Sequence, residues 1–250
     1  MAANKERLDI AVIRRGLAAS REQARALIMA GQVYVGDRIA DKPGMLVPLD
    51  AKFRLAGASD ELKYVSRGGL KLEKALDTFQ LDPSGLVALD VGASTGGFTH
   101  CLLERGAKRV YALDVGHGQL AWTLRNDARV VVMEHTNIRH VTSLPEPVDC
   151  VAIDVSFISL RLVLPAIVPF LTSGAWVVAL VKPQFEAGKA EADRGAGVIS
   201  DPTVHERVLR ELQQWIVQHT PFKVRGLTDS PIYGREGNRE FLLYLSLERK

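Results

Sequence analysis

Residues 87 to 99 read Val87-Ala-Leu-Asp-Val-Gly-Ala-Ser-Thr-Gly-Gly-Phe-Thr99, and this stretch decides the fold of the chain. The apolar, β-branched start predicts a short buried strand over 87–91, and the glycines that follow predict a tight turn whose backbone a ligand can approach closely. From Phe98 onward the apolar spacing becomes helical. A strand, a glycine turn and a helix in this order place a ligand at the carboxyl edge of a parallel sheet.

The turn also limits the kind of nucleotide. A dinucleotide fingerprint has the pattern Gly-x-Gly-x-x-Gly, but Ser94 stands in the place of its second glycine, and no lysine follows Gly97 as a P-loop requires. A nucleoside without a phosphate cluster remains, with Asp90 facing a possible cation, and S-adenosylmethionine fits because it carries an ammonium and a sulfonium. Asp114 ends the next predicted strand about 20 residues after the first glycine, as expected for an acid that binds ribose hydroxyls. The alternative is that both acids are ordinary strand-end residues.

The composition is that of a globular protein of one or two domains, with 250 residues, 47% hydrophobic and 24% charged. Cys101 and Cys150 lie far apart, and neither they nor the histidines show metal-ligand spacing, so we expect no disulfide framework and no metal site. The first residues lack the apolar region of a secretory signal, which favours a cytoplasmic protein. The uncharged stretch Leu162–Val181 is interrupted by prolines and a glycine, which predicts a short helix and a buried strand rather than a membrane span.

The net charge is concentrated in the first quarter of the chain. Residues 1–60 hold ten Lys/Arg and seven Asp/Glu, whereas residues 61–250 hold 22 of each, so the whole excess of +3 lies in the first part. This asymmetry indicates contact with a polyanion. Four arginines on the predicted helices of this region could bind phosphates or could form a solvated face: Arg14, Arg15, Arg21 and Arg25.

The same region resembles a known RNA-binding module. The spacing predicts a helix over 8–15, a second helix that begins at a Ser20 capping box and ends at Gly31, a hairpin over 32–40 and a strand over 53–55. With the runs that begin at Arg7, Arg14 and Ser20, this order resembles the ribosomal-protein-S4-type RNA-binding domain over residues 7–56. The resemblance implies that the two helices and the hairpin present the four arginines to structured RNA.

Strands and helices alternate through the rest of the chain. We expect a helix over 70–79, strands over 110–114, 130–134, 148–154 and 175–182, and helices over 118–124 and 159–170, a pattern typical of a doubly wound parallel sheet. A helix over 204–219 follows. The last two strands, 222–228 and 240–247, form a closing hairpin that would add one antiparallel strand.

Four polar residues fall where such a sheet gathers a site. Asp154 and Lys182 each end an apolar strand, Lys71 begins a helix beside the sheet, and Glu240 begins the last strand. A ribose 2′-hydroxyl is a weak acid, so a base must take its proton as a methyl group arrives. Lys182 could do so if burial and the second ammonium, that of Lys71, favoured its neutral form, with the two acids orienting the lysines and the hydroxyl. The alternative is a purely structural ion pair between Asp154 and Lys182.

Six motifs in order resemble the TlyA family: Ser66-Arg-Gly-Gly-Leu-Lys-Leu72, Leu89-Asp-Val-Gly-Ala-Ser-Thr-Gly-Gly-Phe-Thr99, Asp114-Val-Gly-His-Gly-Gln-Leu-Ala-Trp122, Asp154-Val-Ser-Phe-Ile-Ser-Leu160, Val181-Lys-Pro-Gln-Phe-Glu186 and Gly237-Asn-Arg-Glu240. These are rRNA 2′-O-methyltransferases of the FtsJ-like class, often labelled hemolysin A. The resemblance implies a Lys-Asp-Lys-Glu tetrad at Lys71, Asp154, Lys182 and Glu240, and a cytidine 2′-hydroxyl in ribosomal RNA as substrate. The chain stops just after the last strand, which resembles the shorter branch associated with the large ribosomal subunit.

The expected fold class is therefore α/β, a Rossmann-like methyltransferase sheet of seven strands preceded by a small α/β S4-like domain. We expect the S4-like domain over 1–60, a linker over 61–66 and an S-adenosylmethionine-dependent FtsJ-like methyltransferase domain over 67–250. The residues expected to bind S-adenosylmethionine are Asp90, Gly92, Ala93, Ser94, Thr95, Gly96, Gly97, Phe98, Asp114 and Val115.

The stretch 183–199 reads as a glycine-rich loop over the site, in which Lys189 and Arg194 would touch RNA. We expect Trp122 and Phe157 in the core rather than as base-stacking platforms. The expected partner is ribosomal RNA or a ribosomal subunit, with no membrane, and the chain is expected to be a monomer. Two other functions stay open, a non-catalytic ribosome-assembly factor and a membrane-lytic protein.

Overall fold

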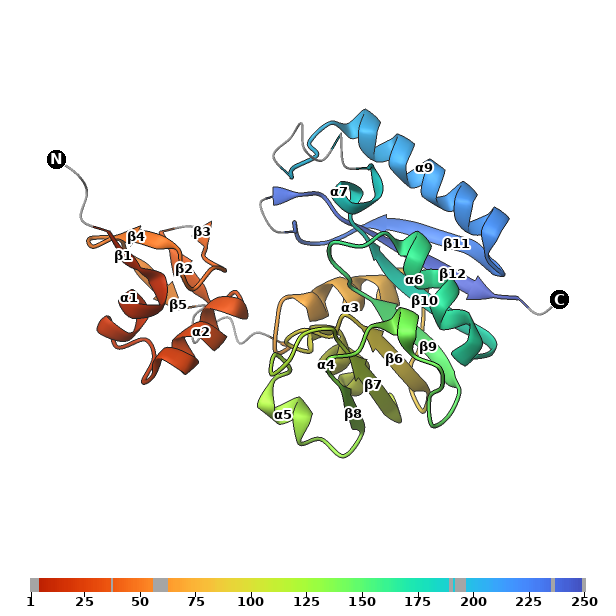
Figure 1. Cartoon of the computed structure of the whole chain (residues 1–250), viewed down its shortest axis with the longest axis horizontal. Helices are drawn as coiled ribbons and strands as arrows, with labels where there is room; N and C mark the ends of the chain where they lie inside the picture. Colours follow the sequence, from red (N-terminus) through yellow and green to blue (C-terminus); the bar gives the residue numbers. More distant parts are fainter. Residues whose placement is uncertain are drawn as a thin grey trace. The chain divides into compact units, whose positions relative to one another are not determined.

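The computed structural model describes residues 5–36, 38–55, 63–188, 191, 197–234 and 237–248. The chain divides into two compact units, Met1–Arg67 and Gly68–Lys250, which Figure 1 draws in red to orange and in yellow to blue. Each unit has its own sheets and its own core.

The first unit packs two short helices against two small antiparallel sheets. Its helices are α1 (Leu8–Arg14) and α2 (Arg21–Met29), and its strands are β1 (Lys5–Arg7), β2 (Val33–Val35), β3 (Arg38–Ile39), β4 (Leu46–Pro48) and β5 (Phe53–Leu55). β1 pairs with β4, and the other sheet has the order β3-β2-β5. Ser20 caps α2 as predicted, because its hydroxyl accepts the backbone N–H of Gln23 at 3.1 Å. The sequence did not predict β1 and β4, since three residues are too few for a recognisable alternation.

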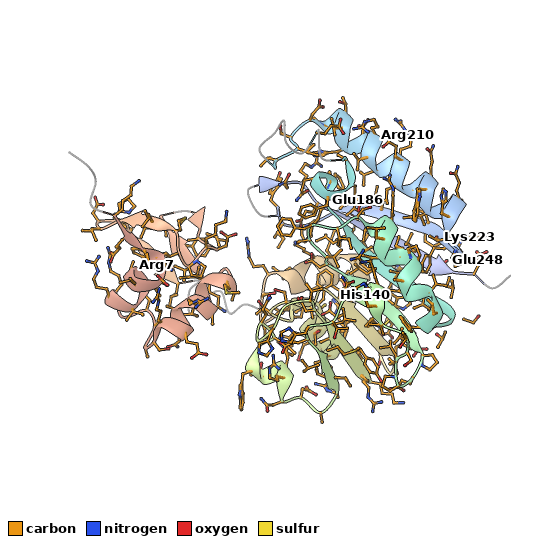
Figure 2. The ribbon with its side chains drawn as sticks, in the orientation of Figure 1. Arg7, His140, Glu186, Arg210, Lys223 and Glu248 are labelled. Atoms are coloured by element: carbon orange, nitrogen blue, oxygen red, sulfur yellow. The ribbon has the colours of Figure 1, made fainter. Side chains whose placement is uncertain are left out.

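A buried aspartate joins the two helices of this unit. The side chain of Asp9 in α1 is fully buried beside core residues Leu8 and Val12. Its carboxylate accepts hydrogen bonds from Arg7, labelled in Figure 2, at 3.0 and 3.1 Å and from Arg21 at 3.0 Å. These bonds, that of Arg7 foremost, lower the pKa of Asp9 to about 2. The charge of Asp9 is therefore neutralised within the unit.

The second unit is built on a seven-stranded sheet with the order β11-β12-β10-β9-β6-β7-β8. The strands are β6 (Val87–Val91), β7 (Arg109–Leu113), β8 (Val130–Met133), β9 (Val148–Ile153), β10 (Leu171–Val181), β11 (Phe222–Asp229) and β12 (Phe241–Leu247). β6 to β10 pair in parallel, and β12 is antiparallel to both of its neighbours. The predicted α/β class with seven strands and a closing hairpin is confirmed.

Helices cover both faces of this sheet, as Figure 1 shows. The core on one face combines alternate residues of the strands with α6 (Leu160–Ile167) and α9 (Pro202–His219). On the other face lies α3 (Gly68–Phe79), whose Phe79 ring is 5.3 Å from the ring of Tyr244 in β12. The helices α4 (Gly97–Glu104), α5 (Trp122–Arg125) and α7 (Pro183–Glu186) follow β6, β7 and β10. The loops after the parallel strands therefore meet at one edge of the sheet.

Two stretches differ from the sequence prediction. The predicted helix over 118–124 is wrong in its first half, because Gly118 has a φ of +64° and its N–H donates to Glu134 at 2.8 Å instead of to a helical turn. The stretch Leu162–Val181 forms the end of α6, a turn of 3₁₀ helix at 168–170 and strand β10, which begins earlier than predicted. Within the described residues, none of the helices has the length and apolar character needed to cross a bilayer.

Candidate active site

Two glycines let the turn between β6 and α4 pass close to its neighbours. Gly92 has a φ of +89°, and a Cβ there would lie 2.4 Å from the carbonyl oxygen of Asp154 after β9. Gly96 has a φ of +99°, and its Cβ would lie 2.3 Å from Cδ1 of Leu124 in α5. Any other residue at these positions would be strained and would clash. The turn is therefore tightly fitted between the loops that follow β7 and β9.

The loops after β6 and β7 are ordered by one carboxylate. Ser94, in the place of the second glycine, adopts the φ of +48° that glycine favours, and its N–H donates to Oδ2 of Asp114 at 2.8 Å. Oδ1 of Asp114 accepts the N–H of Gly116 at 2.7 Å. A carboxylate has about four acceptor positions, so Asp114 can still receive ligand hydroxyls.

Asp90 in β6 is a fully buried acid that its surroundings satisfy only in part. Its Oδ2 accepts the hydroxyl of Thr99 at 2.6 Å, whereas Oδ1 has no hydrogen-bond partner among the described residues. Burial raises the pKa of Asp90 to about 7, and the bond from Thr99 partly counteracts the rise. A buried oxygen without a partner is uncommon in proteins. A cationic ligand would supply the missing partner.

The other residues predicted to bind S-adenosylmethionine differ in exposure. The side chain of Phe98 is buried in α4, whereas Val115 is 67% exposed and the carbonyl of Thr95 accepts the N–H of Ala121 at 3.0 Å. The donor and acceptor set fits the cofactor, with one carboxylate lacking a cation, a second able to accept hydroxyls, and a close-fitting glycine turn. The described residues contain no group of three His, Cys, Asp or Glu placed to hold a metal ion.

The four residues of the predicted tetrad form two ion pairs. Nζ of Lys182 lies 2.6 Å from Oδ1 of Asp154 and donates to the hydroxyl of Ser156 at 3.0 Å. Nζ of Lys71 in α3 donates to Oε2 of Glu240 at 2.5 Å. The side chains of both lysines are about nine-tenths buried, with 10% and 11% exposed. Each ammonium is thus compensated by one carboxylate, as buried charges require.

The sheet brings these two pairs together. β10 and β12 are antiparallel, with Val181 opposite Phe241. The next positions along the two chains, Lys182 and Glu240, are therefore opposite each other, where Cα atoms in a regular ladder lie about 5 Å apart. Asp154 follows β9, the other neighbour of β10, and its N–H donates to the carbonyl of Val91 at 2.9 Å. All four side chains thus stand at the same edge of the sheet as the glycine turn.

The four arginines predicted to bind RNA differ in their contacts. Arg14 pairs with Glu6, and Arg21 donates to Asp9. Arg15 donates to two backbone carbonyls of the β4–β5 connection, at 2.5 and 2.7 Å, and its guanidinium lies over the ring of Phe53. The side chain of Arg25 is exposed and makes no ion pair with any described residue. The other two residues predicted to contact RNA, Lys189 and Arg194, lie outside the described residues.

The prediction that Trp122 and Phe157 belong to the core is wrong. Their side chains are 76% and 88% exposed, because Trp122 begins the short helix α5 and Phe157 lies in the loop after β9 with a φ of +63°. Sequence reasoning also missed Ser156 and Thr99, which contact Lys182 and Asp90. Both lie inside the recognised motifs, so the signal was present, but a hydroxyl has no spacing that shows which group it contacts.

The chain matches two families. Residues 64–247 match the FtsJ-like methyltransferase family, and residues 6–51 match the S4 domain. The chain is 48% identical to the "Putative rRNA methyltransferase YqxC" of Bacillus subtilis, over 98% of this chain and 87% of the relative. It is 46% identical to the 16S/23S rRNA (cytidine-2'-O)-methyltransferase TlyA of Mycobacterium tuberculosis, over 97% of this chain and 90% of the relative.

A solved structure is also similar to the whole chain. It is titled "Putative hemolysin from Streptococcus thermophilus", with a TM-score of 0.76 and 45% identity, and the match covers 100% of this chain and 90% of that one. The matches thus include both structural units and every element that carries the site.

Proposed function

The chain belongs to the FtsJ-like methyltransferase family, and on that premise we propose that it transfers the methyl group of S-adenosylmethionine to the ribose 2′-hydroxyl of a cytidine in ribosomal RNA. The observation that supports this function best is the pair of ion pairs, Lys182 with Asp154 and Lys71 with Glu240, beside the glycine turn. A turn for a nucleoside and a set of proton-handling groups at one sheet edge are the two parts that the reaction needs.

The chemistry of Lys182 suits a hydroxyl acceptor. S-adenosylmethionine supplies an electrophilic methyl group when bound. Two of the three donor positions at Nζ of Lys182 face Asp154 and Ser156, which leaves one position for the substrate hydroxyl. In its neutral form Lys182 accepts the hydroxyl proton as the oxygen–carbon bond forms and the sulfur–carbon bond breaks. Asp154 fixes the direction of the amine, and Lys71 with Glu240 places a second ion pair beside it.

The cofactor would be held by the residues of the two loops after β6 and β7. Asp90 would meet its ammonium through the oxygen that has no partner among the described residues, and Asp114 would accept its ribose hydroxyls. Ser94, Thr95 and the adjoining glycines of 92–97 would contact it through the backbone, with Ala93, Phe98 and Val115 completing the surroundings.

RNA would be bound by both units. Arg14, Arg21 and Arg25 offer exposed cationic side chains to phosphates, while Arg15 is used mainly within the unit. Phe157 follows Ser156, which Lys182 contacts, and its exposed ring offers a surface on which a base can stack. Lys189 and Arg194 are proposed as further RNA contacts. This function places the protein in the cytoplasm, and one chain supplies all four tetrad residues, which supports a monomer.

The experiment is to incubate the protein and S-adenosylmethionine with ribosomal subunits and with free rRNA that lack the modification, and to map 2′-O-methyl groups on both 16S and 23S rRNA. Lys182→Ala should lower the rate by at least about 100-fold, because a positioned base contributes 10²–10⁴. Lys74→Ala, an exposed lysine on the same helix as Lys71, is the matched control and should retain the rate. A wild-type protein that binds RNA but methylates neither substrate would instead indicate a ribosome-assembly factor.

A further inference from the structure

Two loops at the active site are joined at three points. Residues 154–160 follow β9, and residues 182–186 follow β10. Lys182 contacts Asp154 and Ser156, the ring centroids of Phe157 and Phe185 are 5.0 Å apart, and Glu186 binds Ser159 and Leu160. The tetrad accounts for the first of these junctions. The other two lie outside it.

Glu186 makes the strongest of the remaining contacts. Its side chain is buried, in the short helix α7 where Figure 2 labels it. Oε2 accepts the hydroxyl of Ser159 at 2.6 Å, and Oε1 accepts the backbone N–H of Leu160 at 2.7 Å. Both carboxylate oxygens are thus used on one segment, at the first turn of α6. A buried carboxylate that accepts two short hydrogen bonds holds its partners firmly.

The segment that Glu186 binds contains a residue in an unfavourable backbone conformation. Phe157 has a φ of +63°, a left-handed conformation that is unfavourable for a bulky residue, and its ring is 88% exposed. Such a conformation persists only where the surroundings fix it on both sides. On one side Ser156 is bound by Lys182, and on the other Ser159 and Leu160 are bound by Glu186. Without the second anchor, only the bond of Lys182 to Ser156 and the contact between the Phe157 and Phe185 rings would hold Phe157 in this conformation.

We propose that Glu186 is a positioning residue for the methyl transfer, which holds residues 156–160 against α7 so that Ser156 and Phe157 keep their places beside Lys182. The inference rests on the proposed function. Glu186 stands four residues after Lys182. Among the described residues, its hydrogen bonds go to Ser159 and Leu160 and not to a residue of the tetrad. It acts through the loop, which carries the hydroxyl that binds Lys182 and the exposed ring of Phe157.

The kinetic test compares Glu186→Ala with Glu186→Gln at saturating S-adenosylmethionine. The alanine variant should lower kcat for RNA methylation by about 10- to 100-fold, the size of effect that a small misplacement of reacting groups produces. The glutamine variant keeps an oxygen for the N–H of Leu160 and an amide for Ser159, so it should recover most of the rate. The dissociation constant of S-adenosylmethionine should not change in either variant, because the residues proposed to bind it lie after β6 and β7.

The second measurement is hydrogen exchange, which does not depend on activity. Glu186→Ala should speed exchange at residues 156–161, while that of β6 and β9 stays as in the wild type. Glu146→Ala is the control, because Glu146 binds Arg109 and Tyr111 near the amino ends of the strands. It should change neither kcat nor exchange at 156–161. If Glu186→Ala does not fold, Ser159→Ala, which removes one of the two bonds to Glu186, should give the same changes on a smaller scale.

The outcomes separate this inference from the proposed function. A wild-type protein that methylates no RNA contradicts the proposed function, while faster exchange confined to 156–161 in Glu186→Ala still supports the anchoring of the loop. Wild-type exchange at 156–161 in a folded Glu186→Ala protein overturns the inference, as does an unchanged kcat. Equal losses of kcat in the alanine and glutamine variants, in step with lower melting temperatures, also overturn it by assigning Glu186 to general stability.

Discussion

Each unit of this chain contains a fully buried aspartate, and the two are treated in opposite ways. Asp9 of the first unit accepts hydrogen bonds from Arg7 and Arg21, and its pKa is lowered to about 2. Asp90 of the second unit accepts one from Thr99, keeps one oxygen without a partner among the described residues, and its pKa is raised to about 7. Both oxygens of Asp9 have hydrogen-bond partners within its own unit, whereas one oxygen of Asp90 has none among the described residues.

The difference separates a structural charge from a ligand-binding one. Burying a carboxylate is unfavourable unless charges and donors replace the lost water. Where the chain supplies them, as at Asp9, the acid stabilises the fold, and its negative charge is already balanced by arginines of the same unit. Where it does not, as at Asp90, the chain carries an unfavourable group that a cationic ligand would relieve. Functional sites are often destabilising in this manner.

The largest expected effect is on cofactor binding. Asp90→Asn keeps a side chain of the same size that can still accept from Thr99, but it removes the negative charge. We expect the dissociation constant of S-adenosylmethionine, measured by calorimetry, to rise by about 10- to 100-fold, since a hydrogen bond to a charged group contributes about 1.5–3 kcal/mol. Asp9→Asn should leave this constant unchanged. Wild-type affinity in Asp90→Asn would contradict the assignment of Asp90 to the ligand.

The second prediction concerns stability, where the roles are exchanged. Asp9→Asn leaves Arg7 and Arg21 without their carboxylate, and we expect the unfolding free energy of the first unit to fall by about 1–2 kcal/mol. The cost is moderate because the two arginine side chains are 44% and 59% exposed and can bind water instead. Hydrogen exchange of α1 and α2 in the full chain measures it. Unchanged exchange in both helices would show that Asp9 is not a structural charge.

The sequence allowed the second unit to be predicted better than the first. Its parallel strands are apolar runs that end in Asp114, Asp154 or Lys182, so their type and their site-bearing ends were both visible. An ion pair between Asp154 and Lys182 was one of the interpretations that the sequence left open, and the structure contains it. The pairing of Lys71 with Glu240 was not predicted, because these two residues are brought together only by the finished sheet. In the first unit, β1 consists of three charged residues and offers no pattern at all.

The errors at Trp122 and Phe157 have a common physical origin. An isolated aromatic residue is predicted to be buried because of its residue type alone. Whether its side chain can point into the core depends on the backbone conformation, which the sequence does not show. Phe157 has a left-handed φ, and its neighbours Ser156 and Ser159 contact Lys182 and Glu186, which lie 26 and 27 residues further along the chain. Sequence-based reasoning fails there because the conformation is imposed by tertiary contacts, as is common at functional sites.

The third prediction concerns the pH dependence of S-adenosylmethionine binding, which follows from the raised pKa of Asp90. Asp90 has a pKa of about 7 without ligand, and a bound ammonium would lower it, so binding of S-adenosylmethionine below pH 7 releases a proton. The affinity should therefore fall by up to about tenfold per pH unit as the pH drops from 7 to 6. Calorimetry in two buffers of different ionisation enthalpy measures the proton release. Methylthioadenosine, which lacks the ammonium, and the Asp90→Asn variant should both show no such release.

In the ligand-free protein, the two acids should change the unfolding free energy with pH in opposite directions. The pKa of Asp9 is below its ordinary value of 3.8, so its contribution to stability is present above pH 4 and is lost as the pH falls towards 2. The pKa of Asp90 is above that value, so the ligand-free chain binds an extra proton when folded and becomes less stable through this group as the pH rises from about 4 to 7. Subtracting the pH profile of each asparagine variant from that of the wild type isolates the two contributions. Slopes of the same sign would contradict the comparison.

The smallest expected effect concerns two arginines of the first unit, one with partners inside the unit and one without an ion pair among the described residues. Arg15 is completed by two carbonyls and the ring of Phe53, whereas Arg25 is exposed and forms no ion pair with the described residues. If an incomplete charge marks a ligand contact, Arg25→Ala should reduce the salt dependence of RNA binding by about one unit of slope, with no loss of stability. Arg15→Ala should instead lower the unfolding free energy by about 1 kcal/mol and leave the slope nearly unchanged in the folded protein. The opposite result, a lower slope for Arg15→Ala alone, would show that arginines of this unit bind phosphate regardless of their internal contacts, and that the rule holds only for buried groups.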